Sequence, residues 1–300
     1  MVANRAAGHS HFFMGNFSDA QRYLNVALTN YDPITHAGLA NQFGLDVGVT
    51  VHNFQAFNLL IPGQTRRTAI HIEEAESLAM STGHIQTICT TLFQRAAHYS
   101  LMSGDRSDLE RCMNKMEPIA QEHSLTLWKI VTSIMAELLA AHKGDKSSIA
   151  RYRKADAAMI ALKNILGLPS YRVDVARSAL VMGLLEEAAE LAMMAQEMID
   201  ETGEAFALSD LHRQQAAIAI AGDDSETAEK HLVTALEVAR QQRSKFWELR
   251  AAIDLAHLWQ EQGRLDDAFA LLDPVHNSIT EGDCPEDRAT AQAMLREFAT

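Results

Sequence analysis

The sequence predicts an all-α superhelix built from repeated helix pairs, a solenoid. A glycine recurs along the chain with successive gaps of 48, 41, 40, 39, 39 and 41 residues. Apolar residues at spacings of three and four lie before and after each glycine, which is the period of an amphipathic helix. A fixed period of this length indicates one supersecondary unit stacked many times. The recurring residues are Gly15, Gly63, Gly104, Gly144, Gly183, Gly222 and Gly263.

Each unit is predicted to be a pair of helices that cross closely. A helical stretch leads into the glycine, a polar turn follows, and a second helix carries small residues at fixed offsets, as in Gly183, Ala188, Ala192 and Ala195. Small side chains let a neighbouring backbone approach, and glycine adopts the left-handed conformation that commonly ends a helix. Serine and threonine are favourable N-caps. Candidate N-caps of the second helices are Thr65, Ser147 and Ser225.

The chain is predicted to form one solenoid of about seven helix pairs over residues 1–300. The first gap is long because residues 29–46 intervene, and we expect an ordered connection with a helical turn there. The last segment places Ala291, Met294 and Phe298 on one helical face, as a terminal capping helix requires. The predicted repeats are approximately 1–30, 47–82, 84–123, 125–163, 168–201, 205–242 and 246–281, and the capping helix is approximately 286–298.

Composition argues against several classes of protein. The net charge is −13 and no basic run occurs, which disfavours direct binding to nucleic acid or to an anionic membrane. The three cysteines are far apart and form no CxxC pair, so neither a disulfide framework nor a zinc knuckle is indicated. No apolar run approaches the ~18 residues of a membrane-spanning helix. We therefore expect a cytoplasmic protein.

The spacing of glycine and small residues resembles the tetratricopeptide repeat (TPR). That family's usual unit has 34 residues, whereas the period here is nearer 40, and units two to four depart from the pattern at Thr68, Met113 and Met116. The resemblance implies a right-handed α-α superhelix whose first helices line a concave groove. It is carried most closely by the first unit, in Gly8, Gly15, Ala20, Leu24, Ala27 and Pro33.

Longer motifs resemble the C-terminal TPR region of bacterial multidomain signalling ATPases. In that group the repeats follow an ATPase module, often with an adenylate or guanylate cyclase domain or a DNA-binding transcription domain upstream. The resemblance therefore implies the sensor or partner-binding arm of such a protein. The motifs are Tyr31-Asp32-Pro33 with His36 and Asp46, Leu249-Arg250-Ala251-Ala252, Leu258-Trp259-Gln260-Glu261-Gln262-Gly263 and Leu271-Leu272-Asp273-Pro274-Val275.

The chain departs from the full-length pattern of that group. It carries no GxxxxGK[ST] phosphate loop, no cyclase residues and no helix-turn-helix. Met1 falls almost at the start of a repeat. We therefore expect a fragment or a shortened member, without ATP hydrolysis or cyclic-nucleotide synthesis of its own.

The candidate binding residues lie at matching positions on successive first helices, six and ten residues before each glycine. In a TPR groove such positions form ladders along the inner wall. Histidine, arginine, asparagine and glutamine there would bind the backbone or the carboxylates of an extended peptide. The candidates are Arg5, His9, Asn53, Phe57, Gln94, His98, Arg177, His212 and His257.

The sequence predicts no catalytic, cofactor or metal site. His9 and His11 are two residues apart, so on a helix they point to different faces. Adjacent carboxylates such as Glu73 and Glu74 diverge for the same reason, and no nucleophile elbow is present. No constellation has catalytic spacing, so we expect the chain not to be an enzyme.

Three functions follow from these observations. The leading one is a non-catalytic scaffold that binds a protein or peptide partner in the concave groove. The first alternative is a receptor for a small ligand or signal peptide. The second is a self-assembly module, in which Phe12, Phe13 and Tyr23 of the first repeat pack on another copy of the chain.

Overall fold

The computed structural model describes residues 1–36, 38–97, 106–279 and 284–298. Within these ranges every regular element is a helix, which confirms the all-α prediction. Gly104 and His98 lie outside the described residues. The helices are α1 (Val2–Phe13), α2 (Phe17–Thr29), α3 (Leu39–Phe43), α4 (Val47–Leu60), α5 (Thr65–Thr82), α6 (Ile85–Ala97), α7 (Arg106–Glu122), α8 (Thr126–His142), α9 (Ser148–Ala161), α10 (Leu168–Val181), α11 (Leu185–Thr202), α12 (Leu208–Ala221), α13 (Ser225–Gln241), α14 (Lys245–Glu261), α15 (Leu265–Asn277) and α16 (Pro285–Phe298).

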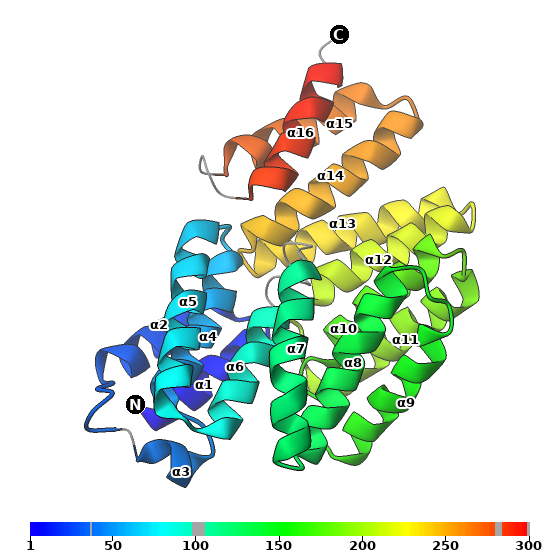
Figure 1. Cartoon of the computed structure of the whole chain (residues 1–300). Helices are drawn as coiled ribbons and strands as arrows, with labels where there is room; N and C mark the ends of the chain where they lie inside the picture. Colours follow the sequence, from blue (N-terminus) through cyan, green and yellow to red (C-terminus); the bar gives the residue numbers. More distant parts are fainter. Residues whose placement is uncertain (37, 98–105, 280–283, 299–300) are drawn as a thin grey trace.

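The helices pack in chain order, as in an all-α solenoid (Figure 1). Among the described residues, consecutive helices pack on each other within the pairs α1–α2, α4–α5, α6–α7, α8–α9, α10–α11, α12–α13 and α14–α15. Each pair also contacts the next one, and α16 packs on α14 and α15 at the C-terminal end. None of the helices in the described ranges has an apolar stretch of membrane-spanning length.

The recurring glycines occupy the turns inside these pairs. Gly15, Gly63, Gly144, Gly183 and Gly263 have φ between 74° and 92°, the left-handed region that glycine adopts without a steric penalty. The sixth turn is different. Gly222 there has a φ of −93°, and the residue after it, Asp223, is left-handed with a φ of 60°. This shift accounts for the longer spacing in the sixth unit, where Ala228 lies six residues after Gly222, whereas Ala188 lies five after Gly183.

The predicted N-caps need correction. At α13 the cap is Asp224, whose carboxylate accepts a hydrogen bond from the Thr227 backbone N–H at 3.0 Å, and Ser225 is the first helical residue. At α5 the cap position is held by Gln64, and Thr65 begins the helix. Ser147 does stand at the cap of α9. At α13, Asp224 takes the cap position in place of Ser225, because a carboxylate is a stronger hydrogen-bond acceptor than a hydroxyl.

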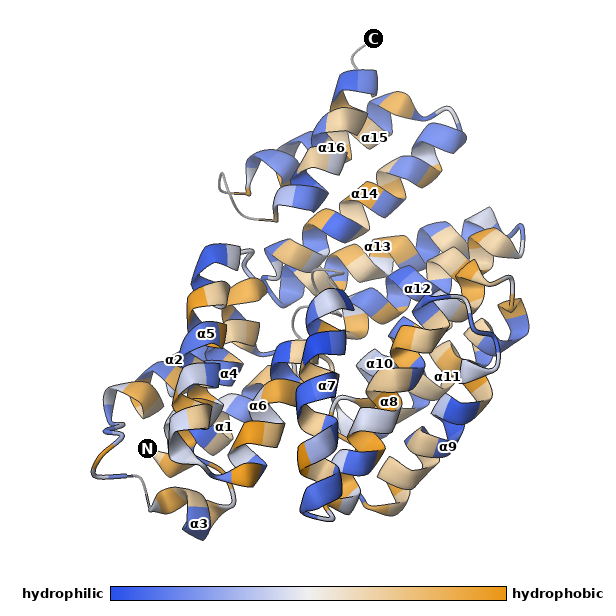
Figure 2. Ribbon diagram, in the orientation of Figure 1, coloured by the Kyte–Doolittle hydropathy of each residue, from blue (hydrophilic) through white to orange (hydrophobic). Residues whose placement is uncertain are grey.

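Small residues sit where the helices cross most closely. Ala20, Leu24 and Ala27 of α2 are fully buried, and Gly8 of α1 faces Leu24. A Cβ added at Gly8 would lie 2.7 Å from Leu24 Cγ, too close for a van der Waals contact. Hydrophobic residues line the contacts between neighbouring helices and hydrophilic ones cover their outer faces (Figure 2). The first pair is therefore held by direct backbone-to-leucine contact.

We expect Gly8→Ala to lower stability by about 1–2 kcal/mol. Overpacking a filled core typically costs about 1–3 kcal/mol. Alanine gains only about 1 kcal/mol in helix propensity over glycine. The clash with Leu24 is therefore expected to outweigh the gain in propensity and to lower the free energy of unfolding. The urea midpoint measures the effect. The control is Gly38→Ala, because an added Cβ there meets nothing within 4 Å. Equal midpoints for the two variants would contradict the close crossing.

The described residues of the connection between the first two pairs include the short helix α3, in line with the helical turn expected there. The Tyr31 hydroxyl donates to the Asp46 carboxylate at 3.1 Å, and the same carboxylate accepts from the Val49 N–H at the start of α4. The Asp32 N–H donates to His36 Nδ1 at 2.9 Å. These bonds fix the connection against the second pair.

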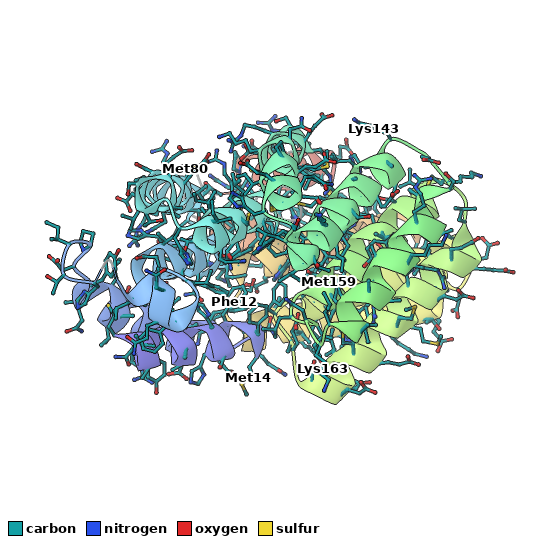
Figure 3. The ribbon with its side chains drawn as sticks, turned by 60° about the horizontal axis from the view of Figure 1, so that its bottom comes forward. Phe12, Met14, Met80, Lys143, Met159 and Lys163 are labelled. Carbon is teal, nitrogen blue, oxygen red and sulfur yellow. The ribbon has the colours of Figure 1, made fainter. Side chains whose placement is uncertain are left out.

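The first two helix pairs contact the turn before the sixth pair and the start of the seventh, which the sequence analysis did not foresee. The backbone N–H groups of Ala205 and Phe206, in the turn between α11 and α12, donate to the Phe13 carbonyl at 2.7 and 3.1 Å. The Phe246 N–H of α14 donates to the Ile61 carbonyl at 3.0 Å. Phe12 lies centrally between the N-terminal helices and the helices of the other half (Figure 3). We call this set of residues, Phe12, Phe13, Ile61, Ala205, Phe206 and Phe246, the closing contact.

The closing contact overturns the prediction that Phe12 and Phe13 are available to a second copy of the chain. Phe12 is 1% exposed, and its ring centroid lies 5.3 Å from that of Phe206 in the same chain. Phe13 contacts Phe206 as well, at 5.7 Å. Tyr23 is half-buried and stacks on His11 at 5.2 Å. The apolar groups of the first repeat are used inside the molecule.

Candidate functional site

Two adjoining spaces open beside the closing contact, and Arg177 of α10 lines both. We call the first the aromatic cavity, between α1, α4, α6, α10, the α11–α12 turn and α14. We call the second the inner hollow, over α10, α12 and α14. Together they contain four of the candidate residues: Phe57, Gln94, Arg177 and His257.

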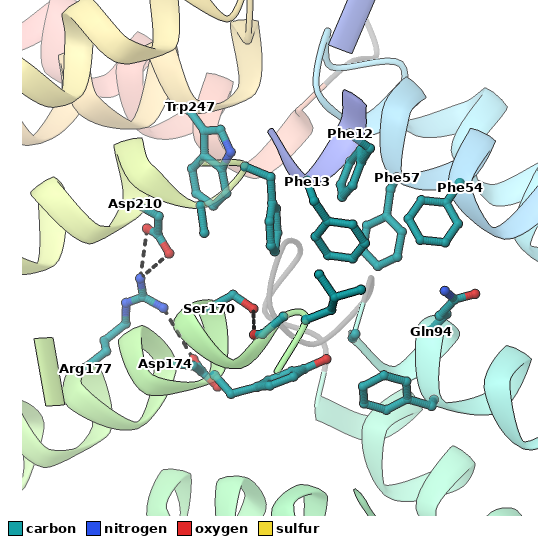
Figure 4. A pocket seen from close by; sticks show the side chains of 17 residues that line it. Phe12, Phe13, Phe54, Phe57, Gln94, Ser170, Asp174, Arg177, Asp210 and Trp247 are labelled. Carbon is teal, nitrogen blue, oxygen red and sulfur yellow. Dashed lines mark hydrogen bonds and ion pairs between the residues drawn. The ribbon is translucent and has the colours of Figure 1, made fainter. Parts of the chain in front are cut away.

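The aromatic cavity is walled by rings from both ends of the chain (Figure 4). It leaves about 70 Å³ for the centres of water-sized molecules, several times the roughly 10–15 Å³ that one water needs. Such a space suits an apolar group, because a pocket lined by aromatic rings and a few polar groups excludes water from what it binds. The rings belong to Phe12, Phe13, Phe54, Phe57, Phe93, Tyr171, Phe206 and Trp247.

One side of the cavity carries a row of alternating charges. Arg177 donates to Asp210 at 2.8 and 2.9 Å and to Asp174 at 3.3 Å, as the dashed lines of Figure 4 show. Arg213 continues the row by contacting Asp210 at 3.0 Å and Asp254 at 2.6 Å. Burial opposes the ionisation of Asp210, but Arg177 and Arg213 outweigh it and keep the pKa of this carboxyl below its ordinary value.

The row continues toward the N-terminal half through α7. Arg106 forms a two-point ion pair with Asp174, at 2.8 and 3.1 Å, and the Asp174 side chain is 3% exposed. Charged pairs of this kind are strong when both donors of a guanidinium meet one carboxylate. The polar side of the cavity is therefore rigid and internally neutralised.

The inner hollow is the accessible part of the inner wall. Arg177, Ala216 and His257, which stand six residues before Gly183, Gly222 and Gly263, line it together. Its volume is about 360 Å³ on the same measure as the cavity. Val181 (85% exposed) and Ile220 (41% exposed) add apolar surface to it. The glycine register thus places the three ladder positions of α10, α12 and α14 on one surface.

The other candidate residues lie elsewhere. Asn53 is not available to a partner, because its side chain is 3% exposed and its amide donates to Thr91 Oγ1 at 3.1 Å. Phe57 (9% exposed) and the half-buried Gln94 face the aromatic cavity rather than an open groove. His98 lies outside the described residues. The N-terminal half of the predicted groove is closed by the chain itself.

The N-terminal and sixth-unit candidates are also engaged internally. The His9 ring stacks on Phe54 with centroids 3.7 Å apart, and burial together with the Arg5 charge lowers the pKa of His9 to about 3. Arg5 is itself half-buried, and burial lowers its pKa. His212 faces His231 of α13, with Nδ1 atoms 3.3 Å apart. These residues hold helices together and do not share a surface with Arg177.

Sequence reasoning missed the residues that complete the site. Asp174 and Asp210 each stand three residues before an arginine, Arg177 and Arg213, so a signal was present as an Asp-x-x-Arg pattern repeated one unit apart. Phe206 had a weaker signal, as a large aromatic residue at the start of the predicted repeat 205–242. Trp247 had no sequence signal. A tryptophan near the start of a helix is expected to pack in the core, so nothing marked it as part of a site.

A buried carboxyl group lies against the wall of the cavity. Glu204 is 4% exposed and precedes the two residues that bond Phe13. It accepts hydrogen bonds from the Gly167 N–H at 3.1 and 3.2 Å. Burial raises the pKa of Glu204 to about 7, although the Gly167 N–H opposes that rise. The group therefore titrates near neutral pH, beside the closing contact.

We expect the protein to lose stability between about pH 4.5 and pH 7 because of Glu204, and Glu204→Gln to remove that loss. The folded state holds the proton more tightly than the unfolded chain, so the Glu204 contribution is full below pH 4.5 and is lost as pH rises through 7. The difference between about 7 and 4.5 corresponds to roughly 3 kcal/mol. Melting temperatures at pH 5 and pH 8 measure it.

The melting temperatures at pH 5 and pH 8 are compared between Glu204→Gln, the unaltered chain and a control variant. Glu204→Gln should melt higher than the unaltered chain at pH 8 and close to it at pH 5. Glu201→Gln, an exposed residue of α11, should leave both melting temperatures unchanged. A Glu204→Gln variant that melts lower at pH 8 would show that the carboxylate is stabilising in its ionised form.

No protein-family model matches the sequence, and no curated protein matches it. The interpretation of the site therefore depends on its own residues. These are an aromatic cavity, a neutralised row of charges and an adjoining hollow with exposed apolar side chains.

Proposed function

We propose that the chain is a non-catalytic interaction scaffold of the TPR type, a right-handed superhelix that binds a segment of a protein partner in the inner hollow. One observation supports this above the others: Arg177 and His257, from equivalent positions of α10 and α14, line one open surface, and the fully buried Ala216 holds the equivalent position on α12. Repeat proteins commonly bind partners along such equivalent positions, since stacking aligns them.

The chemistry of the hollow suits an extended segment with an apolar anchor. Val181 and Ile220 are exposed apolar side chains on α10 and α12, a surface that gains free energy when it is covered. Arg177 is 38% exposed in its side chain, and His257 is exposed. These two groups would donate hydrogen bonds to carbonyl or carboxylate oxygens beside the anchor.

The carboxylates of the site support a binding role more than a catalytic one. Asp174 and Asp210 both lie within ion-pair distance of Arg177, at 3.3 and 2.8 Å. Arg177 and Arg213 hold the pKa of the Asp210 carboxyl below its ordinary value, which makes it a poor acceptor of a substrate proton. The row is better suited to keeping α10, α12 and α14 in register.

A receptor for a small ligand is the second candidate, and the aromatic cavity favours it. The cavity joins an apolar lining to a few polar groups, the usual composition of small-molecule pockets. Trp247 is 3% exposed, and its Nε1 has no hydrogen-bond acceptor among the described residues. A ligand with an aromatic or aliphatic body and one acceptor atom would suit this space.

The resemblance to bacterial signalling ATPases suggests the setting. In that setting the chain would be the partner-binding region of a larger cytoplasmic protein with an ATPase, cyclase or transcription domain. Binding in the hollow would then bias the attached domain. This step depends on the sequence motifs alone.

Selection of peptides from a displayed random library tests the proposal. Peptides selected on the purified chain should share an apolar residue and bind with micromolar affinity or better. Val181→Asp should weaken the binding of these peptides by about tenfold or more, because fully burying a valine side chain contributes roughly 1.5–3 kcal/mol. Val26→Asp is the matched control, since Val26 is 44% exposed on α2, away from the hollow.

The outcomes separate the two candidates. Peptides that bind the Val181→Asp and Val26→Asp variants equally well would exclude the hollow as the binding surface. Failure to select any peptide, together with a small-molecule screen whose hits raise the melting temperature and lose that effect in Trp247→Phe, would favour the receptor. A raised melting temperature is expected from any ligand that binds only the folded state.

A further inference from the structure

Three potential metal ligands meet at the contact between α4 and α5, away from the cavity and the hollow. His52 lies on α4, and His71 and Glu74 lie one turn apart on α5. The Nδ1 atoms of the two histidines are 3.0 Å apart. A Glu74 carboxylate oxygen lies 3.1 Å from His52 Nδ1 and 3.6 Å from His71 Nδ1. The three atoms form a nearly equilateral triangle.

The triangle has the size of one face of a metal tetrahedron. Zinc binds imidazole nitrogen and carboxylate oxygen at about 2.0–2.1 Å, which places neighbouring ligand atoms roughly 3.3–3.4 Å apart in tetrahedral geometry. The three observed separations, 3.0, 3.1 and 3.6 Å, lie on both sides of that distance. Small side-chain rotations would complete the fit.

The two imidazoles already share a proton where a cation would sit. At 3.0 Å one Nδ1 must donate to the other, so one lone pair is occupied by a hydrogen. A cation that replaces the shared proton would find two lone pairs and one carboxylate.

The site is shielded on the protein side and open on the other. The His52 and His71 side chains are 15% and 18% exposed, whereas Glu74 is 51% exposed. His52 and Glu74 also line a shallow surface hollow together with Glu73, Ser77 and Ser81. A cation can enter from this hollow, and a water molecule can occupy the fourth position.

We propose that His52, His71 and Glu74 bind one zinc-type divalent cation, with the fourth position open to the surface hollow. Two imidazoles and a carboxylate favour Zn²⁺ or Co²⁺ over Mg²⁺ and Ca²⁺, which take mainly oxygen ligands. In the folded chain the cysteines offer little competition. Cys89 and Cys112 are buried, and burial raises the pKa of each thiol to about 11, so few thiolates are present.

The sixth pair contains a natural comparison. His212 and His231 are separated by 19 residues, as His52 and His71 are, and their Nδ1 atoms are 3.3 Å apart. The polar neighbour of His212 is the Gln215 side chain rather than a carboxylate. Among the described residues, the triad of the second pair is the only such cluster of three ligands. A carboxylate therefore distinguishes the two histidine pairs.

Titration of the purified full chain with Zn²⁺ against a chromophoric chelator tests the proposal. We expect one equivalent to bind, and Co²⁺ to show the visible absorption of a tetrahedral site. His71→Ala should weaken binding by more than about 100-fold, exceeding the 10–100-fold effect typical of removing an outer-shell partner. Glu74→Gln should weaken it too, and this exposed residue can change without unfolding the protein. His231→Ala is the control and should bind as the unaltered chain does.

Two results would overturn the site. One is the absence of stoichiometric Zn²⁺ binding by the unaltered chain. The other is equal binding by His71→Ala, Glu74→Gln and His231→Ala, which would place any bound metal elsewhere. Circular dichroism on each variant shows whether it is folded, and if His71→Ala is not, Glu74→Gln decides. A tenfold excess of Mg²⁺ should leave the Zn²⁺ titration unchanged.

Discussion

Phe206→Ala is expected to separate the N-terminal helix pairs from the C-terminal half and to lower stability by about 3–5 kcal/mol, as removal of a buried phenylalanine does. Phe206 is 9% exposed and contacts Phe12 and Phe13 with ring centroids 5.3 and 5.7 Å away. In most solenoids a repeat contacts only its neighbours. Here a turn between the fifth and sixth pairs packs on the first, so one side chain joins distant parts of the chain.

The loss should appear as a change in shape as well as in stability. The backbone bonds from Ala205 and Phe206 to the Phe13 carbonyl are the direct polar links of this turn to α1, and they depend on the ring staying in place. Small-angle scattering should therefore show a larger radius of gyration, and thermal unfolding an earlier first transition. Phe269→Ala is the control, since that ring is 40% exposed on α15.

A Phe206→Ala variant that stays compact would give the Phe206 ring a different role. If its radius of gyration equals that of the Phe269→Ala control while its melting temperature falls, the ring fills a cavity without holding the ends together. In that case the Phe246 to Ile61 bond and the Arg106–Asp174 pair keep the array closed. Combining Phe206→Ala with Arg106→Gln then becomes the informative variant.

The elements of the fold were predictable because they depend on local rules. Each turn needs a left-handed residue, and glycine supplies it at Gly15, Gly63 and Gly183, so the period is legible in the sequence. The exception is informative. At the sixth turn Asp223 takes the left-handed position, and Gly222 before it is nearly regular, so counting glycines alone misplaces that turn by one residue.

The inner wall was predictable in one half of the molecule only. Arg177, Ala216 and His257 do share a surface, because stacking keeps equivalent positions of α10, α12 and α14 in line. The same register places Phe57 in the closed half, where the array meets itself. Whether a superhelix closes on itself depends on the small rotation between each helix pair and the next, added over many pairs. No pattern of residues in the sequence predicts that total rotation.

The histidine triad shows a second limit. His52 and His71 come from different helices, and their contact depends on how α4 and α5 pair across the turn at Gly63. The two closely spaced histidines, His9 and His11, do not meet, since His9 stacks on Phe54 and His11 stacks on Tyr23. Both facing histidine pairs are 19 residues apart in the sequence, but that spacing can be recognised as a contact only once the helix pairing is known.

Arg172→Met is expected to destabilise the chain by about 3–5 kcal/mol, the usual cost of leaving one charge of a buried pair alone. Arg172 of α10 forms a two-point ion pair with Asp156 of α9, at 2.9 and 3.1 Å. Its third contact is the Met194 carbonyl of α11, at 2.6 Å. Both side chains of the pair are 3% exposed. Removing the guanidinium leaves the Asp156 carboxylate without its charged partner inside the fourth and fifth pairs.

The double variant Asp156→Leu with Arg172→Met separates the two roles of this pair. Replacing both charges by apolar groups of similar size is often neutral or stabilising by about 1–4 kcal/mol, because neither ion then needs to be desolvated. We therefore expect the double variant to unfold at a higher urea concentration than Arg172→Met alone. If it does not, the unpaired Asp156 carboxylate costs little, because both variants equally lack the bond to the Met194 carbonyl. Arg172→Lys then decides, because an ammonium keeps the charge but cannot span Asp156 and Met194 together.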